Sequence, residues 1–210
     1  DVIADLDVWN KFDYIISISD ACKDAFLKTH PSLESKIVLV ENVTSPDFVR
    51  KMAEEPIKCT FSKQHFNIVS VGRLCEQKAF DRAVEVLNVV HQKGFTNIKW
   101  YIVGDGGDKS KIEALIDCYD LQNSFILLGS TTNPYPYIKA ADLYIQPSRY
   151  EGKAVTITEA HILAKPVLIT NYATSASQIT DNVDGFICEQ DIESIAYAVI
   201  KLYQNENLRN

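Results

Sequence analysis

Short runs of β-branched and aromatic residues alternate with amphipathic stretches from Asn67 onward, and this alternation restricts the fold more than any other feature of the sequence. The runs predict strands at 67–71, 98–103, 125–128, 143–146, 167–170 and 185–188. The stretches between them predict helices at 80–93, 110–119, 137–141, 154–164 and 191–203, with Gly94 ending the first and Asp191 capping the last. Such alternation is typical of an α/β fold, here a Rossmann-like parallel sheet with helices on both faces.

A smaller βαβ piece precedes this domain. It comprises a strand at 14–19, a helix at 20–29 and a strand at 36–40, too little structure to bury both of its faces. The next stretch contains Pro46, Pro56 and several charges, as linkers do. We therefore expect 1–45 to be the tail of another domain, 46–65 a linker and 66–210 a complete domain. Because the chain starts at Asp1 without an initiator Met or a charged-then-apolar leader, we expect an excised piece without a signal peptide.

Composition excludes two classes of protein. Hydrophobic residues make up 46% of the 210 and charged residues 23%, and no apolar run approaches the roughly 18 residues that a membrane helix needs. Any membrane contact is therefore expected to be peripheral. With 21 basic and 28 acidic residues, the formal net charge is −7, whereas nucleic-acid-binding proteins carry a basic face. No nucleic-acid partner is expected.

The cysteines indicate neither disulfides nor a zinc site, because they are odd in number, scattered and without metal-ligand spacing. They are Cys22, Cys59, Cys75, Cys118 and Cys188. We expect them to be reduced, small core residues of a cytoplasmic protein.

The segments that follow the predicted strands are polar and rich in glycine. They are 72–78, 104–107, 129–131 and 147–153. In an open parallel sheet, ligands bind in the crevice outside the carboxyl ends of the strands, so these segments are the candidate site. The glycines at 104–107 resemble part of a dinucleotide fingerprint, but the first strand carries no GxGxxG, so that motif is weak. No Ser/His/Asp or Cys/His nucleophile set is present, and His30, His65, His91 and His161 are dispersed.

Arg73 and Lys78 place two cations on one connection between a strand and a helix. A forked guanidinium and a mobile ammonium suit a diphosphate whose charge grows as it leaves. The adjoining Gly72 permits close approach of the backbone. The alternative is that both side chains are solvated surface cations.

Glu151 and Glu159 flank the start of the helix predicted at 154–164. There they could accept hydrogen bonds from sugar hydroxyls, while exposed amides of Lys153, Ala154 and Val155 could meet phosphate oxygens. The alternative is a loop charge at Glu151 and a helix-surface charge at Glu159.

These motifs, in this order and spacing, resemble the C-terminal, donor-binding domain of the family-four retaining glycosyltransferases of GT-B fold. The resemblance covers about 66–203 and rests on the pieces Val71-Gly72-Arg73-Leu74, Gln77-Lys78, Val103-Gly104-Asp105-Gly106, Leu128-Gly129, Ala141-Asp142-Leu143, Pro147-Ser148, Glu151-Gly152, Glu159-Ala160 and Lys165-Pro166-Val167. The segment 13–42 is similar to the last βαβ unit of the N-terminal, acceptor-binding domain.

The resemblance implies a role for each candidate residue. Arg73 and Lys78 would hold the diphosphate, Glu151 would contact the transferred sugar and Glu159 the ribose, and Arg73, Lys78 and Glu151 would be catalytic. The nucleobase would lie near Gly129, Ser130 and Thr131, and Gly72, Gly104, Gly152, Lys153, Ala154 and Val155 would complete the donor site. The sequence departs from the family at Gly152-Lys153-Ala154, where many relatives have Gly-Phe-Gly, so Lys153 either contacts phosphate or points to solvent.

The implied activity is retaining transfer of a sugar from a nucleotide-sugar donor, expected to be UDP-linked, to a glycan or lipid-linked acceptor in surface polysaccharide assembly. No metal ion and no separate cofactor are expected, and the enzyme would act in the cytoplasm or at the inner face of the membrane. The acceptor would bind through the N-terminal domain, so we expect the chain by itself to be inactive. Two rivals remain: an epimerase or phosphorylase of the same fold, and a non-catalytic nucleotide-binding module.

Overall fold

The protein is described by a computed structural model, which covers residues 6–57 and 61–209. Its larger sheet has six parallel strands in the order β5-β4-β3-β6-β7-β8. These strands are β3 (Phe66–Val71), β4 (Ile98–Val103), β5 (Phe125–Gly129), β6 (Leu143–Gln146), β7 (Val167–Thr170) and β8 (Phe186–Cys188). The predicted Rossmann-like α/β fold is confirmed, and the predicted strands and helices differ from the observed ones only at their ends.

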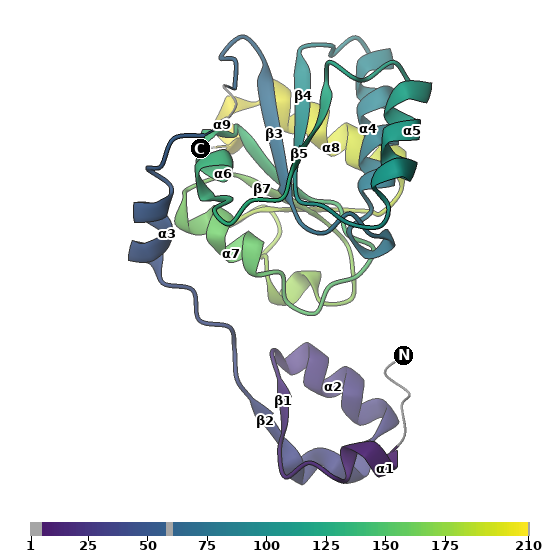
Figure 1. Cartoon of the computed structure of the whole chain (residues 1–210), viewed down its shortest axis with the longest axis vertical. Coiled ribbons are helices and arrows are strands. Elements are labelled where there is room, and N and C mark those ends of the chain that lie inside the picture. The colour runs from purple at the N-terminus through teal and green to yellow at the C-terminus, as the bar shows by residue number, and fades with distance from the viewer. Residues whose placement is uncertain (1–5, 58–60, 210) are drawn as a thin grey trace.

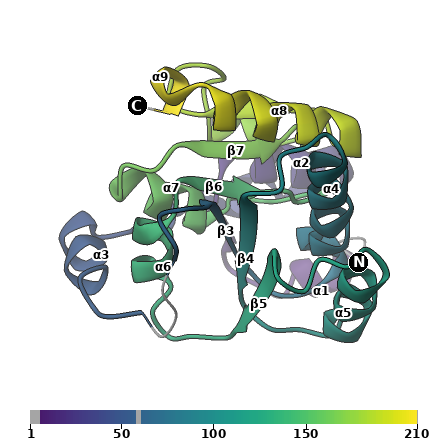
Figure 2. The same cartoon turned by 90° about the horizontal axis from the view of Figure 1, so that it is seen from above.

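Helices cover both faces of this sheet (Figure 2). One face carries α4 (Phe80–Gln92), α5 (Lys109–Cys118) and α8 (Ile192–Gln204), and the other carries α6 (Tyr135–Ala140) and α7 (Val155–Ile162). Neighbouring strand residues alternate between the two cores, with Ile68 facing α4 and Val69 facing α6 and α7. Helix α7 ends before its predicted end at 164, because Ala164 takes a left-handed φ of 52°. The chain ends with the short helix α9 (Glu206–Arg209).

The N-terminal residues form a separate small layer, which lies below the larger sheet in Figure 1. It consists of α1 (Leu6–Trp9), β1 (Ile15–Ser17), α2 (Asp20–Thr29), a 3₁₀ turn (Pro31–Lys36) and β2 (Ile37–Leu39), with β1 and β2 paired in parallel. Its apolar side chains are poorly covered: Tyr14 is 71% exposed and Ile16 is 66% exposed. They border an open apolar hollow of about 1020 Å³, which also contacts Trp9 and Phe26. The piece thus leaves one face unburied, as its small size predicts.

The stretch at 46–65 contains a helix that the sequence analysis did not predict, α3 (Pro46–Met52). It packs against α6 and α7 at the side of the larger sheet (Figure 1). The Ser45 hydroxyl caps it by accepting a hydrogen bond from the backbone N–H of Phe48, and Val49 is fully buried. Part of the predicted linker is therefore fixed on the larger domain.

The expectation that the cysteines are core residues is wrong for Cys22, Cys75 and Cys118 and is met in part by Cys188, which packs against the hydrophobic core. Cys118 is exposed, and Cys22, Cys75 and Cys188 are partly exposed; all four carry free thiols. Cys118 is the last residue of α5, which buries Ile112 and Ile116 instead. Cys59 lies outside the described residues.

Candidate active site

The candidate site lies where the order of the strands reverses direction. Strand β3 pairs with β4 on one side and with β6 on the other. The chain therefore builds one half of the sheet outward from β3 through β4 to β5, and the other half outward from β6 through β7 to β8. Such a switch point opens a crevice at the carboxyl ends of the two central strands. Lys78 follows β3 and Glu151 follows β6, so the topology places both at this crevice.

Backbone atoms form the floor of the crevice beside the ends of β3 and β4. Gly104 has φ 153°, and a Cβ at this position would lie 1.9 Å from the carbonyl oxygen of Gly72. Only glycine allows that approach. The resulting cavity of about 260 Å³ is lined by Val71, Gly72, Arg73, Val103, Gly104, Asp105, Ser130, Thr131 and Pro134. Gly129, with φ 76°, borders a smaller hollow of about 30 Å³ together with Ser130 and Thr131. These cavities thus bring Arg73 close to Ser130 and Thr131, whereas Lys78 lines neither of them.

Lys78 is not a solvated surface cation. Its aliphatic chain lies over Gly72, where an added Cβ would come within 3.1 Å of the Lys78 Cε atom. Its Nζ atom lies 2.6 Å from Glu151 Oε1, and the two side chains are 17% and 6% exposed. Arg73 differs, because it is exposed and has no hydrogen-bond or ion-pair partner within 6–57 and 61–209.

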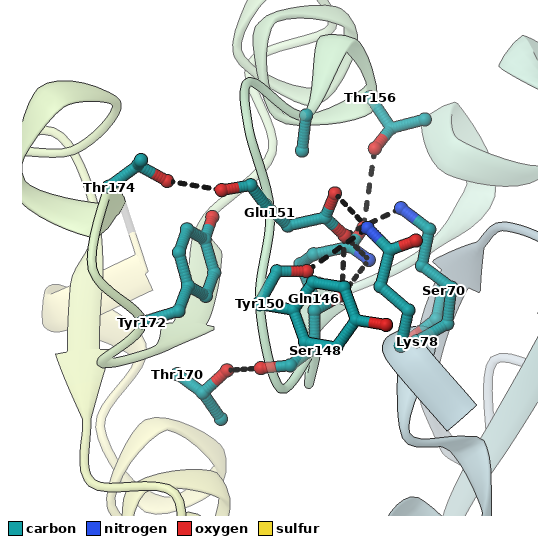
Figure 3. Close-up of polar contacts among 12 residues, drawn as sticks. Ser70, Lys78, Gln146, Ser148, Tyr150, Glu151, Thr156, Thr170, Tyr172 and Thr174 are labelled. Atoms are coloured by element: carbon teal, nitrogen blue, oxygen red, sulfur yellow. Dashed lines mark hydrogen bonds and ion pairs between the residues drawn. The ribbon is translucent and has the colours of Figure 1, made fainter. Parts of the chain in front are cut away.

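Glu151 is held by donors on several sides (Figure 3). Its Oε1 atom accepts hydrogen bonds from Ser148 Oγ at 2.6 Å and Gln146 Nε2 at 3.3 Å, besides the Lys78 contact. Its Oε2 atom accepts one from Gln77 Nε2 at 3.2 Å. A simple loop charge is therefore excluded. No role was predicted for Gln77, Gln146 or Ser148 from the sequence. The signal that could have indicated Gln146 is its polar side chain at the end of a buried strand.

Two loops of the site are joined into one unit by Arg149. Its backbone N–H donates to the carbonyl of Gln77 at 2.8 Å, and its Nη1 donates to the carbonyl of Glu76 at 2.6 Å. Its guanidinium also makes two hydrogen bonds of 3.0 Å to the carboxylate of Asp81, which Lys111 contacts at 2.7 Å. Burial by itself raises the pKa of Asp81, but the hydrogen bonds from Arg149 and Lys111 outweigh it and lower the pKa to about 2.

Asp81→Asn is expected to destabilise the fold by about 1–2 kcal/mol at neutral pH, a value reduced for partial solvent screening. Because the folded-state pKa lies below the ordinary value of 3.8, the stabilisation by the Asp81 carboxylate is present above that value and is lost as the pH falls toward 2. Urea unfolding from pH 7 to pH 2.5 measures the difference between variant and wild type. A difference that did not shrink on acidification would contradict the assignment.

Glu159 is not a helix-surface charge. It projects from α7, is 9% exposed, and its Oε1 accepts a hydrogen bond from the Tyr135 hydroxyl at 3.0 Å. Burial raises the pKa of Glu159, and the Tyr135 hydrogen bond offsets part of this rise. The sequence analysis missed Tyr135. The remaining accepting capacity of this desolvated carboxylate suits the hydroxyls of a ligand.

The loop at Gly152-Lys153-Ala154 differs from expectation in two ways. Lys153 has a partner that was not predicted from the sequence: its Nζ atom pairs with Glu41 Oε1 at 2.6 Å. The amide of Ala154 is not exposed, because it donates to Gln178 Oε1 at 2.7 Å. Val155 is the first residue of α7. A Cβ at Gly152 would lie 3.2 Å from the Sγ atom of Cys22, so this loop touches the N-terminal layer.

No three His, Cys, Asp or Glu side chains in 6–57 and 61–209 lie together so that they could hold a metal ion. No helix in the same ranges is long and apolar enough to cross a membrane.

Known proteins are similar to most of this chain. The sequence is 31% identical over 173 residues to an uncharacterized glycosyltransferase of Methanocaldococcus jannaschii, covering 80% of this chain and 42% of that protein. It is 32% identical over 155 residues to the poly(glycerol-phosphate) alpha-glucosyltransferase of Bacillus subtilis, covering 73% of this chain and 23% of that enzyme. A crystal structure of a mutant of Staphylococcus aureus TarM in complex with fondaparinux, alpha-GlcNAc-glycerol and UDP superposes with a TM-score of 0.78 at 26% identity, covering 95% of this chain and 38% of that one.

The chain spans less than half the length of each of these proteins. Residues 52–210 match the family described as glycosyl transferases, group 1. Because this match covers most of the chain, including the whole six-stranded sheet and both candidate glutamates, the chain belongs to the group 1 glycosyl transferases.

Proposed function

We propose that the chain is the donor-binding half of a retaining glycosyltransferase that uses a UDP-linked sugar. The observation that carries the proposal is the pair of Lys78 and Glu151 at the switch point, on the same strand-to-helix connection as Arg73, which lines the neighbouring cavity. A cation clamp next to a desolvated carboxylate matches a ligand that joins a diphosphate to a sugar. The solved TarM complex, which contains UDP, supports the choice of nucleotide.

Lys78 can serve both parts of such a donor. An ammonium group has three N–H donors, and Glu151 takes one of them, so two remain for phosphate oxygens. As the bond between the sugar and the diphosphate breaks, the electron pair moves to the phosphate oxygen, and Arg73 and Lys78 stabilise its growing charge. An acceptor hydroxyl then attacks the same face of the sugar and passes its proton to the oxygen of the departing diphosphate. We propose a glycan or lipid-linked acceptor in surface polysaccharide assembly; the name of the Bacillus subtilis relative, a poly(glycerol-phosphate) alpha-glucosyltransferase, supports a polymeric acceptor.

The proposal assigns the ribose to Glu159 and the transferred sugar to Glu151, so variants of the two glutamates test it separately. Glu159→Gln is expected to weaken binding of UDP and of its sugar conjugates alike, by about tenfold, because it removes an anionic acceptor from the ribose. Glu151→Gln is expected to weaken only the conjugates. Isothermal titration of UDP, UDP-glucose and UDP-N-acetylglucosamine into wild type and both variants measures the difference. Equal losses of UDP affinity in the two variants would contradict the division, and absence of any binding by the wild type would overturn the proposed function.

A further inference from the structure

We propose that Gln146 is a positioning residue: its amide fixes Glu151 so that Oε1 is saturated by protein donors and Oε2 remains for a hydroxyl of the donor sugar. This inference rests on the proposed function. The basis is a chain of hydrogen bonds that runs from a buried tyrosine through Gln146 and Ser148 to the Glu151 carboxylate (Figure 3).

The Gln146 amide is held by Tyr144 on its oxygen side. The side chains of Tyr144 and Gln146 have no solvent-exposed surface, and the Tyr144 hydroxyl lies 2.7 Å from Gln146 Oε1. Burial raises the pKa of Tyr144, so its hydroxyl keeps its proton and donates it. Thr156 Oγ1 also donates to Gln146 Oε1, at 3.3 Å. The amide oxygen thus faces Tyr144 and Thr156, and the NH₂ group faces Glu151, whose carboxylate can only accept hydrogen bonds.

The NH₂ group of Gln146 then meets only acceptors. It donates to Ser148 Oγ at 2.8 Å and to Glu151 Oε1 at 3.3 Å. Because Ser148 Oγ accepts from Gln146, its own proton is free to go to Glu151 Oε1 at 2.6 Å. A reversed amide would place its oxygen against the Glu151 carboxylate. Since such a buried repulsion is costly, one orientation of the whole chain is favoured.

The two carboxylate oxygens of Glu151 differ in the number of hydrogen bonds that they accept. Oε1 accepts hydrogen bonds from Lys78, Ser148 and Gln146, whereas Oε2, among the residues that the structure describes, accepts one from Gln77 alone. The backbone of the loop is fixed from the side of β7, because Thr170 and Thr174 donate to the carbonyls of Ser148 and Glu151. A carboxylate held in this way presents one oxygen with accepting capacity to a ligand and loses little freedom when it binds.

Gln146→Glu tests the inference, because it keeps the shape of the side chain but replaces the NH₂ donor by a carboxylate oxygen next to Glu151. The nearby titratable groups are Lys78, Tyr144, Tyr172 and Glu159. At pH 8 the variant is expected to bind UDP within about twofold of wild type and to bind the UDP-sugar about tenfold more weakly. Toward pH 5 the carboxyl introduced at position 146 takes up a proton, because it is buried and lies next to another carboxylate, and this restores a donor, so the loss is expected to shrink.

The probes are UDP, UDP-glucose and UDP-N-acetylglucosamine, titrated into the full 210-residue chain at pH 5 to pH 8. Gln122→Glu is the matched control, because Gln122 also donates from its amide to a carboxylate, that of Asp117, but on the exposed surface. It is expected to leave all affinities unchanged. Tyr144→Phe is the second variant: it removes the hydroxyl that orients the amide without adding charge, and it is expected to weaken the UDP-sugar about threefold at every pH, with UDP unchanged.

The outcomes separate the inference from the proposed function. A selective, pH-dependent loss in Gln146→Glu supports the inference, and if that variant does not fold, a selective loss in Tyr144→Phe supports it. Equal losses for UDP and its conjugates, an unchanged conjugate affinity, or a loss in Gln146→Glu that does not vary with pH overturns it while the proposed function stands. A wild-type chain that binds neither UDP nor either conjugate overturns both.

Discussion

The 210-residue chain on its own is expected to bind a UDP-sugar and to transfer nothing from it. The larger domain carries the residues that we propose to contact the donor, from Arg73 and Lys78 to Glu159, whereas the N-terminal layer is one βαβ piece with an uncovered apolar face. In a closed two-domain cleft, the second domain excludes water and holds the acceptor hydroxyl against the sugar. Such positioning contributes about 7–11 kcal/mol to lowering a barrier, so its loss slows transfer by about 10⁵-fold or more.

Affinity is also expected to be modest, in the micromolar to millimolar range, because a one-sided crevice buries less of its ligand than a closed cleft. The chain is incubated with UDP- and GDP-linked sugars and a mixed panel of lipid and oligosaccharide acceptors, and products are scored by mass spectrometry. Calorimetry under the same conditions is the control, since it shows that the donor is bound while no product forms. Robust transfer by this chain alone would contradict the half-enzyme interpretation.

The strands of the larger sheet were predictable because parallel strands are buried on both faces. Strands β4, β6 and β7 read as short apolar runs bounded by glycine, proline or charged residues, and they occur at their predicted bounds. Helix α3 was missed, although Ser45 followed by Pro46 and Asp47 is a typical helix start. The nearby prolines and charges indicated a linker. The helix is stabilised by packing against α6 and α7, and the local sequence does not indicate that contact.

The candidate residues were predictable by type, but their partners were not. Glycine-rich and charged segments after parallel strands locate a crevice, which sufficed to single out Arg73, Lys78, Glu151 and Glu159. The pairing of Lys153 with Glu41 joins residues 112 positions apart in the sequence, and no local pattern indicates it. No local pattern indicates the hydrogen bond from the Tyr135 hydroxyl to Glu159 either, because this contact depends on how α6 packs beside α7.

Lys78→Ala and Arg73→Ala are both expected to weaken UDP binding, by about ten- to hundredfold, because each removes a charge-assisted contact worth roughly 1.5–3 kcal/mol. They are expected to differ in stability. Arg73 is exposed and without a partner among the described residues, so its loss leaves the free energy of unfolding unchanged. Lys78 is paired with a Glu151 side chain that is 6% exposed, and breaking a buried pair costs up to about 3–5 kcal/mol.

The cost of Lys78→Ala is expected at the low end of that range, because Ser148, Gln146 and Gln77 still donate to the Glu151 carboxylate. Adding Glu151→Gln to Lys78→Ala is expected to recover most of the stability, since a neutral amide needs no cation, but none of the UDP affinity. Urea unfolding and calorimetry on the three variants measure both quantities. Unchanged UDP affinity in both single variants would refute the diphosphate site, whereas equal unfolding midpoints for Arg73→Ala and Lys78→Ala would refute the buried pair alone. The two measurements therefore separate the role of Lys78 in binding from its role in holding Glu151.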